Sequence, residues 1–538
     1  MADDDPGTND STGLGLSALV VGSGTLLSRI FGLVRDMAIA SVFGASRITD
    51  VFFIAYQIPS MFRKLLAEGA LSSAVVPVYV DVKNEQSPED AARLASATFT
   101  WTVLGVGAFV ALCIVLAPLL VAAIAPGFLG TPSFDEAVHL TRLMFPFLLM
   151  MSGAAVAMGV LHARKHYATS AYASVFLNLA LISSVLFLAP YLGEDPESQV
   201  PALAVGVLIG GFLQFYVQWQ GLSLMGIRLR WNPNWRLEGL KRIVTMMGPM
   251  VLGLAVVQMI AFVDKIIASF LDPGNISHLY YSNRLFQFPF GLVGIALGTV
   301  VLPESSEHVS RSDLKKVART TRQSLGLMTF LLIPASVGLA LIGRPLIGVL
   351  FERESFTTMD QSVTAAVLLF ALLGLVAYGM IRIFVSLCYS FEDTKGPVLA
   401  ASVALVMNAV LDVAFVWWWP GNPVYRVCGL TLAGSLAVWV QARVLRVRLR
   451  KHVTDFTLIP WENVIRHLAL SAFMTVTLVP LVLRDQSEFV EVISVTLVGA
   501  TVYLGAAYWV GDPYPVRLKN VLLRKLTGDQ SDTDRGND

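Results

Sequence analysis

Residues 201–225 read PALAVGVLIGGFLQFYVQWQGLSLM, a stretch without one charged side chain. At a rise of about 1.5 Å per residue, a helix of this length crosses a hydrocarbon core about 30 Å thick. The apolar run is continuous and does not alternate with polar residues, as a strand of a membrane barrel would. The segment therefore predicts a membrane-spanning helix, and similar segments fill most of the chain.

The composition supports this interpretation. Of the 538 residues, 55% are hydrophobic and 14% are charged, whereas soluble domains are about one quarter charged. A single soluble core stops growing at about 250–300 residues. We therefore expect an all-α polytopic membrane protein. The net charge of +1 argues against a nucleic-acid partner, and the three cysteines have no metal-ligand spacing.

About 14 segments are long and apolar enough to span a membrane. We predict spans at residues 14–43, 49–80, 93–125, 136–161, 168–190, 201–225, 240–270, 277–302, 318–342, 360–390, 396–419, 427–445, 464–483 and 489–511.

The distribution of lysine and arginine predicts the orientation. With the N-terminus in the cytoplasm, and with residues near span ends counted in the adjoining loops, the cytoplasmic loops and tail hold 26 of the 39 basic residues, the opposite loops hold 5, and 8 lie deeper within spans. Cytoplasmic loops carry the excess of positive charge in membrane proteins. We therefore expect a multi-pass membrane protein with both termini in the cytoplasm.

An internal repeat divides the predicted spans. Val75-Val76-Pro77 matches Val300-Val301-Leu302-Pro303, and Ala173-Ser174-Val175 matches Ala401-Ser402-Val403. Further matches occur in the same order over six spans. The chain is thus predicted to hold two parallel six-helix repeats plus two C-terminal helices, and such halves usually enclose a central site.

This organisation gives five predicted regions. The acidic start lacks the basic segment of a signal peptide, and the C-terminal segment interleaves apolar and basic residues as interfacial helices do. The regions are a disordered acidic N-terminus (1–13), an N-lobe (14–225), a C-lobe (226–459), two further helices (460–511), and an amphipathic interfacial helix with a disordered tail (512–538).

Several charged residues lie inside predicted spans, where each costs at least about 2.5–3.5 kcal/mol at mid-bilayer. Arg29, Arg35 and Arg63 lie in the first two spans and Arg284 in the eighth. A guanidinium group suits phosphate better than an ammonium does, so a cavity lined by these arginines predicts an anionic substrate. Snorkelling or structural ion pairs are the alternative, and for Asp50, near a span end, the structural role is favoured.

A second polar group lies in the later spans. Asn408 and Asp412 are four residues apart and share one face of the eleventh span, while Asp264 lies in the seventh. Together they could supply the oxygen ligands that a hard cation prefers. Interhelical hydrogen bonding explains the same residues equally well.

Signatures of soluble enzymes are absent from the sequence. It contains no phosphate-binding glycine loop with lysine, no HExxH and no GxSxG. These enzyme classes are therefore not expected.

Two groups of motifs closely resemble the MurJ (MviN) family. The first is SRIFGLVRD at 28–36, FGA at 43–45, TDVFF at 49–53, IP at 58–59 and RKLLAEGA at 63–70. The second is YYSNRL at 280–285, FP at 288–289 and GIALGT at 294–299. The family belongs to the multidrug/oligosaccharidyl-lipid/polysaccharide exporter superfamily. Its members flip lipid II, the undecaprenyl-pyrophosphate-linked precursor of peptidoglycan.

The resemblance implies roles for residues of this chain. The family's cavity arginines correspond to Arg29, Arg35, Arg63 and Arg284, and two substrate-site acids to Asp36 and Asp50. The last two spans would hold the polyprenyl tail. Some members bind sodium at positions matching Asp264, Asn408 and Asp412, with Ser435 as a weaker candidate.

Three positions depart from the family pattern. Gln57 stands where some members have lysine, Gln287 where some have glutamate, and Lys265 adjoins the predicted sodium ligand Asp264. Lys265 could replace or repel the cation, so these departures bear on the coupling mechanism.

The resemblance implies a monomeric flippase of the bacterial cytoplasmic (inner) membrane that moves lipid II to the outer leaflet by alternating access. It would have no catalytic residues and no cofactor apart from sodium as a candidate coupling ion, and residues 460–511 would form its lipid-tail groove. It would contact bacterial membrane lipids and no nucleic acid. Another exporter of the superfamily, for polysaccharide lipids or drugs, is the alternative, although a cationic cavity disfavours cationic drugs. A non-transporting membrane scaffold is the third hypothesis, and it leaves the buried arginines without a purpose.

Overall fold

The computed structural model describes residues 7–311, 313–419, 421–452 and 460–516, and every regular element in these ranges is helical. The chain forms two compact units. Unit 1 comprises Met1–Ser277 with Phe351–Thr357, and unit 2 comprises His278–Leu350 with Thr358–Asp538. The all-α prediction is confirmed.

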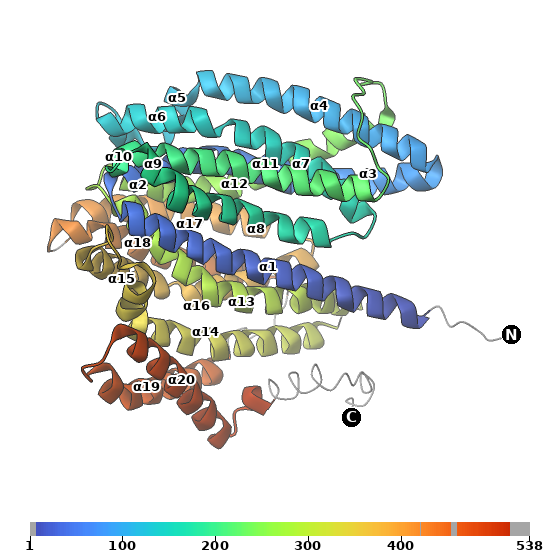
Figure 1. Cartoon of the computed structure of the whole chain (residues 1–538). Helices are drawn as coiled ribbons and strands as arrows, with labels where there is room; N and C mark the ends of the chain where they lie inside the picture. Colours follow the sequence, from blue (N-terminus) through green and yellow to red (C-terminus); the bar gives the residue numbers. More distant parts are fainter. Residues whose placement is uncertain (1–6, 312, 420, 453–459, 517–538) are drawn as a thin grey trace. The chain divides into compact units, whose positions relative to one another are not determined.

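Unit 1 contains the first helices of the chain, and α8 packs against both α1 and α11 (Figure 1). Its elements are α1 (Gly7–Phe43), α2 (Arg47–Phe62), the π-helical η1 (Arg63–Leu71), α3 (Ser72–Glu85), α4 (Pro88–Val115), α5 (Ala117–Ile124), η2 (Pro126–Phe128), α6 (Pro132–Met144), α7 (Pro146–Ala163), α8 (Ala168–Ser183), the π-helical η3 (Ser184–Leu188), α9 (Ala189–Leu192), α10 (Pro196–Gln199), α11 (Pro201–Leu224) and α12 (Glu238–Ala268).

Unit 2 holds the remaining helices, and α19 packs against α20 at its C-terminal end. Its elements are α13 (Asn275–Ser310), whose first turn belongs to unit 1, α14 (Leu314–Phe351), α15 (Thr358–Leu372), α16 (Leu375–Ser390), α17 (Lys395–Trp417), η4 (Pro423–Arg426), α18 (Val427–Leu449), α19 (Trp461–Val482) and α20 (Glu488–Trp509).

Each of the 14 predicted spans coincides with a helix or with a run of consecutive helices. Among the described residues, ten helical segments are long and apolar enough to cross a membrane, or eleven if the bent pair α15–α16 counts as one span. Helices α1, α12 and α13 occupy the other three predicted positions. The chain is therefore a multi-pass membrane protein.

The boundary between the units differs from the predicted boundary at 225/226. Helix α12 belongs to unit 1 because it packs on η1 and α3. Gly69 in η1 allows this packing, since a Cβ there would collide with the side chain of Leu254. Arg242 of α12 also pairs with Asp81 of α3 at 2.8 Å.

The two ends of the chain also differ from the prediction. Helix α1 begins at Gly7, so residues 7–13 are helical where we expected disorder. After α20, Asp512 and Tyr514 are buried within unit 2. The rest of the predicted interfacial helix and tail, 517–538, lies outside the described residues, as do residues 1–6 of the predicted N-terminal region.

Local sequence explains where helices begin. The side chain of Ser46 accepts a hydrogen bond from the backbone N–H of Thr49 at the start of α2, and Ser87 does the same for Asp90 at the start of α4. Pro146 opens α7, because proline has no N–H to leave unsatisfied at a first helical position. These residues define where the three helices begin.

Small residues set the spacing between helices. A Cβ on Gly159 of α7 would meet Val75 of α3 at 2.8 Å, and one on Gly210 of α11 would meet Leu177 of α8 at 2.6 Å. Membrane helices use small residues in this way, since lipid gives no hydrophobic force for their association. Close backbone approach therefore holds unit 1 together.

An ion pair closes one end of unit 2. Asp393, in the loop between α16 and α17, accepts hydrogen bonds from Nε and Nη2 of Arg448 at 2.8 and 3.3 Å. It also accepts one from the backbone N–H of Gly396 at 2.9 Å. The hydrogen bonds from Arg448 hold the pKa of the Asp393 carboxyl below its ordinary value.

This pair predicts a pH-dependent stability. A carboxyl whose pKa is lowered in the folded state stabilises the fold at pH values above the ordinary aspartate pKa of about 4. This stabilisation is lost as the pH falls through the pKa of the folded state. Arg448→Gln should therefore lower the melting temperature of the detergent-solubilised protein at pH 7, and this difference should shrink as the buffer is acidified below about pH 4. A difference that is constant with pH would contradict the assignment.

Candidate functional sites

Arg35 lies in α1 with only 9% of its surface exposed, beside the fully buried Asp36. Its Nε and Nη2 donate to Oδ1 of Asp36 at 2.9 and 2.6 Å. Its Nη1 donates to Oδ1 of Asn178 on α8 at 3.0 Å. The predicted pair of Arg35 and Asp36 is therefore present, and a neighbouring helix orients it.

Asn178 is a further candidate residue that the sequence interpretation missed. Its Nδ2 donates a hydrogen bond to the backbone carbonyl of Ser28 on α1 at 3.1 Å, while its Oδ1 accepts one from Nη1 of Arg35. It is 6% exposed. One amide therefore fixes both the arginine and the helix that carries it. The available signal was an asparagine in an apolar span, where polar side chains usually join helices.

Arg63 begins the π-helical segment η1 between α2 and α3. Single-turn π segments are frequent at functional sites, because the widened turn displaces side chains from the α-helical register. The guanidinium carbon of Arg63 lies 6.0 Å from the ring centre of Phe147 on α7, within the range of a cation–π contact. The aromatic face thus helps to hold a cation at mid-span.

Arg29 and Arg284 are less enclosed. Arg29 is exposed on α1, two turns before Arg35, and Arg284 is half-buried on α13 in unit 2. The neighbouring Tyr281 is fully buried. The structure thus places three of the predicted arginines in unit 1 and one in unit 2.

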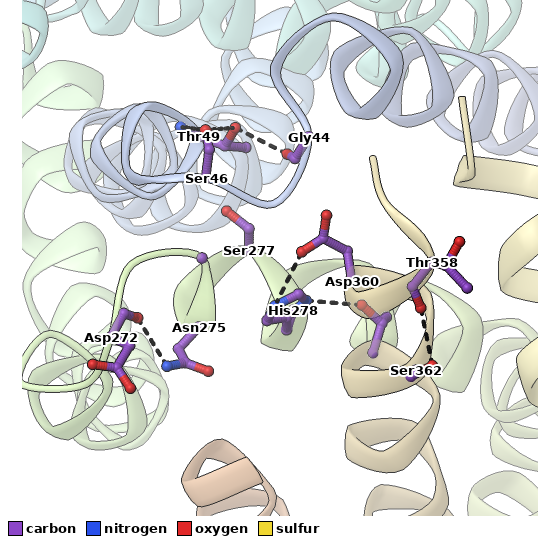
Figure 2. A network of polar contacts seen from close by, with 12 residues as sticks. Gly44, Ser46, Thr49, Asp272, Asn275, Ser277, His278, Thr358, Asp360 and Ser362 are labelled. Atoms are coloured by element: carbon purple, nitrogen blue, oxygen red, sulfur yellow. Dashed lines mark hydrogen bonds and ion pairs between the residues drawn. The ribbon is translucent and has the colours of Figure 1, made fainter. Parts of the chain in front are cut away.

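Asp50 has a structural environment. This buried carboxylate on α2 accepts hydrogen bonds from the backbone N–H groups of Gly274 and Ser277, both at 2.7 Å, and from the Ser277 hydroxyl at 2.5 Å. Ser277 lies in the first turn of α13 (Figure 2). A carboxylate at a helix N-terminus satisfies its free N–H groups and the positive end of its dipole. This geometry favours the structural role of Asp50.

Lys265 turns toward α2. Its Nζ donates to Oε1 of Gln57 at 2.6 Å. Both residues depart from the family pattern, and the structure brings them together within unit 1. A cation contributed by α12 therefore lies beside Gln57.

The predicted sodium ligands on α17 and α18 lie in unit 2. Nδ2 of Asn408 donates to Oδ2 of the fully buried Asp412 at 2.7 Å. Ser435 on α18 donates to the carbonyl of Phe370 at 2.8 Å. Asp264 belongs to unit 1. Carboxylate, amide and hydroxyl oxygens are donors that fit a hard cation, so the chemistry of this set suits sodium.

His278 was also missed by the sequence interpretation. It begins the unit 2 part of α13 and is 5% exposed. Its Nδ1 lies 2.9 Å from the Thr364 hydroxyl on α15, and its Nε2 lies 3.7 Å from the Asp360 carboxylate (Figure 2). No spacing in the sequence relates His278 to α15, so only the fold reveals this contact.

Comparison with known proteins identifies the family. The family model described as lipid II flippase MurJ matches residues 39–499. The chain is 36% identical over 441 residues to a probable lipid II flippase MurJ of Vibrio cholerae, covering 80% of this chain and 81% of the relative. It is 34% identical over 442 residues to the lipid II flippase MurJ of Burkholderia cenocepacia, covering 80% and 83%.

Similarity to solved structures supports the same family. A lipid II flippase MurJ in an inward closed conformation has a TM-score of 0.76 and 26% identity, covering 92% of this chain and 99% of that chain. An inward-facing multidrug MATE transporter has a TM-score of 0.62 at 13% identity, covering 81% and 98%, which shows a shared fold alone. From the family model and these relatives, we conclude that the chain belongs to the MurJ family of lipid II flippases and is a membrane transporter rather than a catalytic enzyme.

Proposed function

We propose that this protein carries lipid II from the inner to the outer leaflet of the bacterial cytoplasmic membrane by alternating access, and that its span arginines bind the pyrophosphate. The observation that carries the proposal is the guanidinium of Arg35, buried in a membrane helix and oriented by Asp36 and Asn178. Such a group is costly inside a bilayer, so its retention favours a functional role.

Arg35 and Asp36 form an ion pair that a pyrophosphate could open. A phosphate oxygen offers a guanidinium the same charge-assisted hydrogen bonds that a carboxylate does, so substrate could take the place of Asp36. Arg63, held over Phe147, and the exposed Arg29 add positive charge in the same unit. Arg284 contributes from unit 2.

A drug exporter of the same fold is the second candidate. The likeness to a multidrug MATE structure favours it at the level of fold. A cationic drug, however, would meet arginines where it needs acids. The charge of these side chains therefore supports a lipid-linked pyrophosphate as substrate.

Replacing the arginines tests the proposed site. Each charge-assisted contact contributes about 1.5–3 kcal/mol, or roughly tenfold to a hundredfold in affinity. We expect Arg35→Ala and Arg284→Ala to abolish growth when the chain replaces a depleted lipid II flippase, with accumulation of lipid II. Arg35→Lys should rescue growth partly, because the fork of donors is lost.

The control for this experiment is Arg142→Gln. Arg142 is an exposed arginine of α6 whose Nε donates to the backbone carbonyl of Ile114 at 3.1 Å, so it fits a structural role. This variant should support growth. Full growth with an Arg29→Ala, Arg284→Ala double variant present at normal levels in the membrane would refute the proposed site.

We propose further that both termini lie in the cytoplasm, on the basis of the 26-to-5 distribution of basic residues. A cysteine at exposed Asn422 should react with an impermeant thiol reagent added to intact cells, and one at exposed Arg228 should react only after lysis. The three native cysteines are buried and give a low background. The opposite labelling would reverse the orientation and the direction of transport.

Sodium is the proposed coupling ion. Asn408, Asp412 and Ser435 would contribute oxygens in unit 2, and Asp264 is the fourth proposed ligand. The ammonium of Lys265, the alternative occupant, is bonded to Gln57. A bound ion shifts a conformational equilibrium by its difference in affinity for the two states.

Thermal unfolding in sodium and in potassium tests the coupling ion. The purified protein should melt at a higher temperature in sodium, since a ligand bound only by the folded state stabilises it. Asp412→Asn should remove this difference. Asp393→Asn, which alters a carboxylate outside the spans, should lower the melting temperature equally in both salts and keep the difference. Equal melting of the unchanged protein in the two salts would leave Asp412 with a structural role.

A further inference from the structure

Unit 2 contains a second cationic site, separate from the span arginines. A cavity of about 260 Å³ lies where the start of α14, the start of α19 and the segment after α20 meet. It is lined by Arg319, Arg322, Gln323, Asn463 and Tyr514. Its volume is slightly below the range of about 300–1,000 Å³ that is typical of small-molecule sites.

Tyr514 forms one wall of this cavity. Its ring is buried, with 4% exposed. Its hydroxyl donates a hydrogen bond to the carbonyl of Gln323 at 3.4 Å and accepts one from Nδ2 of Asn463 at 3.4 Å. Gly326 makes this approach possible, because a Cβ there would collide with the Tyr514 hydroxyl. The glycine therefore leaves room for two polar groups beside α14.

A buried polar network holds Tyr514 in place. The backbone N–H of Tyr514 donates to Oδ1 of Asp512 at 3.0 Å. Oδ2 of Asp512 lies 3.3 Å from Nε2 of His467, whose Nδ1 lies 3.1 Å from the Thr329 hydroxyl. Asp512 and His467 are 2% and 0% exposed. The wall is thus fixed before any ligand binds, which reduces the ordering that binding would require.

The charge of the cavity is positive. Arg319 and Arg322 are exposed and three residues apart, so they share one face of α14. In the ranges that the structure describes, neither forms an ion pair with a carboxylate. Two guanidinium groups, an amide and a phenol provide many hydrogen-bond donors for one ligand. This donor set fits the oxygens of a phosphate group.

The surroundings of the cavity are apolar and face outward. Trp461, Tyr508 and Trp509 are exposed by 54%, 68% and 87% at the same ends of α19 and α20. Exposed aromatic side chains at helix ends mark the level of lipid headgroups. Along α19, Ile465 and Leu468 are also exposed, by 63% and 51%, and provide a surface for acyl chains.

We propose that this cavity binds the phosphodiester of a membrane phospholipid, with Arg319 and Arg322 on the phosphate oxygens and the acyl chains along α19. Its phosphate-binding arginines are distinct from those proposed for the pyrophosphate of lipid II, while α19 is also one of the two helices expected to hold the polyprenyl tail. Bound lipid would join α14, α19 and the segment Asp512–Tyr514 at the membrane surface. Soluble phosphate has the same chemistry, but the aromatic surroundings favour a lipid.

Photo-crosslinking of the full chain tests the site. A phosphatidylglycerol with a diazirine in its headgroup is added to protein in a neutral detergent, and the labelled peptides are mapped by mass spectrometry. We expect labels on residues 319–326, 461–466 or 512–516. Arg319→Gln with Arg322→Gln should reduce this labelling about tenfold, as loss of charge-assisted contacts predicts. Tyr514→Phe should reduce it less.

The matched control is Arg228→Gln with Arg230→Gln. These two exposed arginines precede α12 in unit 1, and their removal changes the net charge equally. Labelling of the three segments should be unchanged in this variant, and a diazirine diacylglycerol, which lacks the phosphate, should label them weakly. Equal labelling of the arginine variant and the control would overturn the proposal. Displacement of the lipid by millimolar inorganic phosphate would assign the cavity to a soluble ligand instead.

Because the readout is a crosslink and not transport, failure of the flippase proposal would leave this result unchanged. The arginine variant should also still rescue growth in the depletion assay. Loss of rescue with unchanged labelling would contradict a separate lipid site.

Discussion

A polar side chain inside a membrane helix has to find a partner within the protein, often on another helix, because lipid cannot supply one. In this protein such pairs fix how helices meet. Asn178 joins α8 to Arg35 and to the backbone of α1, and Asp50 joins α2 to the first turn of α13. His467 joins α19 to Asp512 and Thr329. Apolar packing holds the helices together. These few hydrogen bonds determine which of their similar apolar surfaces face one another.

The hydrogen-bond partners also distinguish buried acids that look equivalent in the sequence. Asp36 and Asp50 are both buried acids of the first two predicted spans. Asp36 bonds to a guanidinium, whereas Asp50 bonds to backbone N–H groups. The first arrangement can exchange one anion for another at the arginine. The second closes a helix end and has no cation to release.

The sequence predicts the fold of this protein well because the signal for each span is local. The uninterrupted apolar run at 201–225 is enough by itself to predict a helix, and α11 occupies it almost residue for residue. The site is less accessible to sequence analysis. The arginines could be identified from their cost in a bilayer, but Asn178, Gln57 and His278 depend on contacts with residues more than 80 positions away. The assignment of α12 to unit 1 likewise depends on Gly69 and Leu254, which no repeat reveals.

The π-helical segment η1 makes this region tolerant of one change of length. It joins α2 to α3 without a break between Arg63 and Leu71. A π-helical turn holds more residues than an α-helical turn, so a one-residue deletion there could restore an ordinary α-helix and leave the later side chains of α3 facing as before. Val75 would then keep its close packing against Gly159. The same deletion at the start of α3 would turn every later side chain by about 100° around the axis, so alignment gaps between homologues should fall in η1 rather than in the helices beside it.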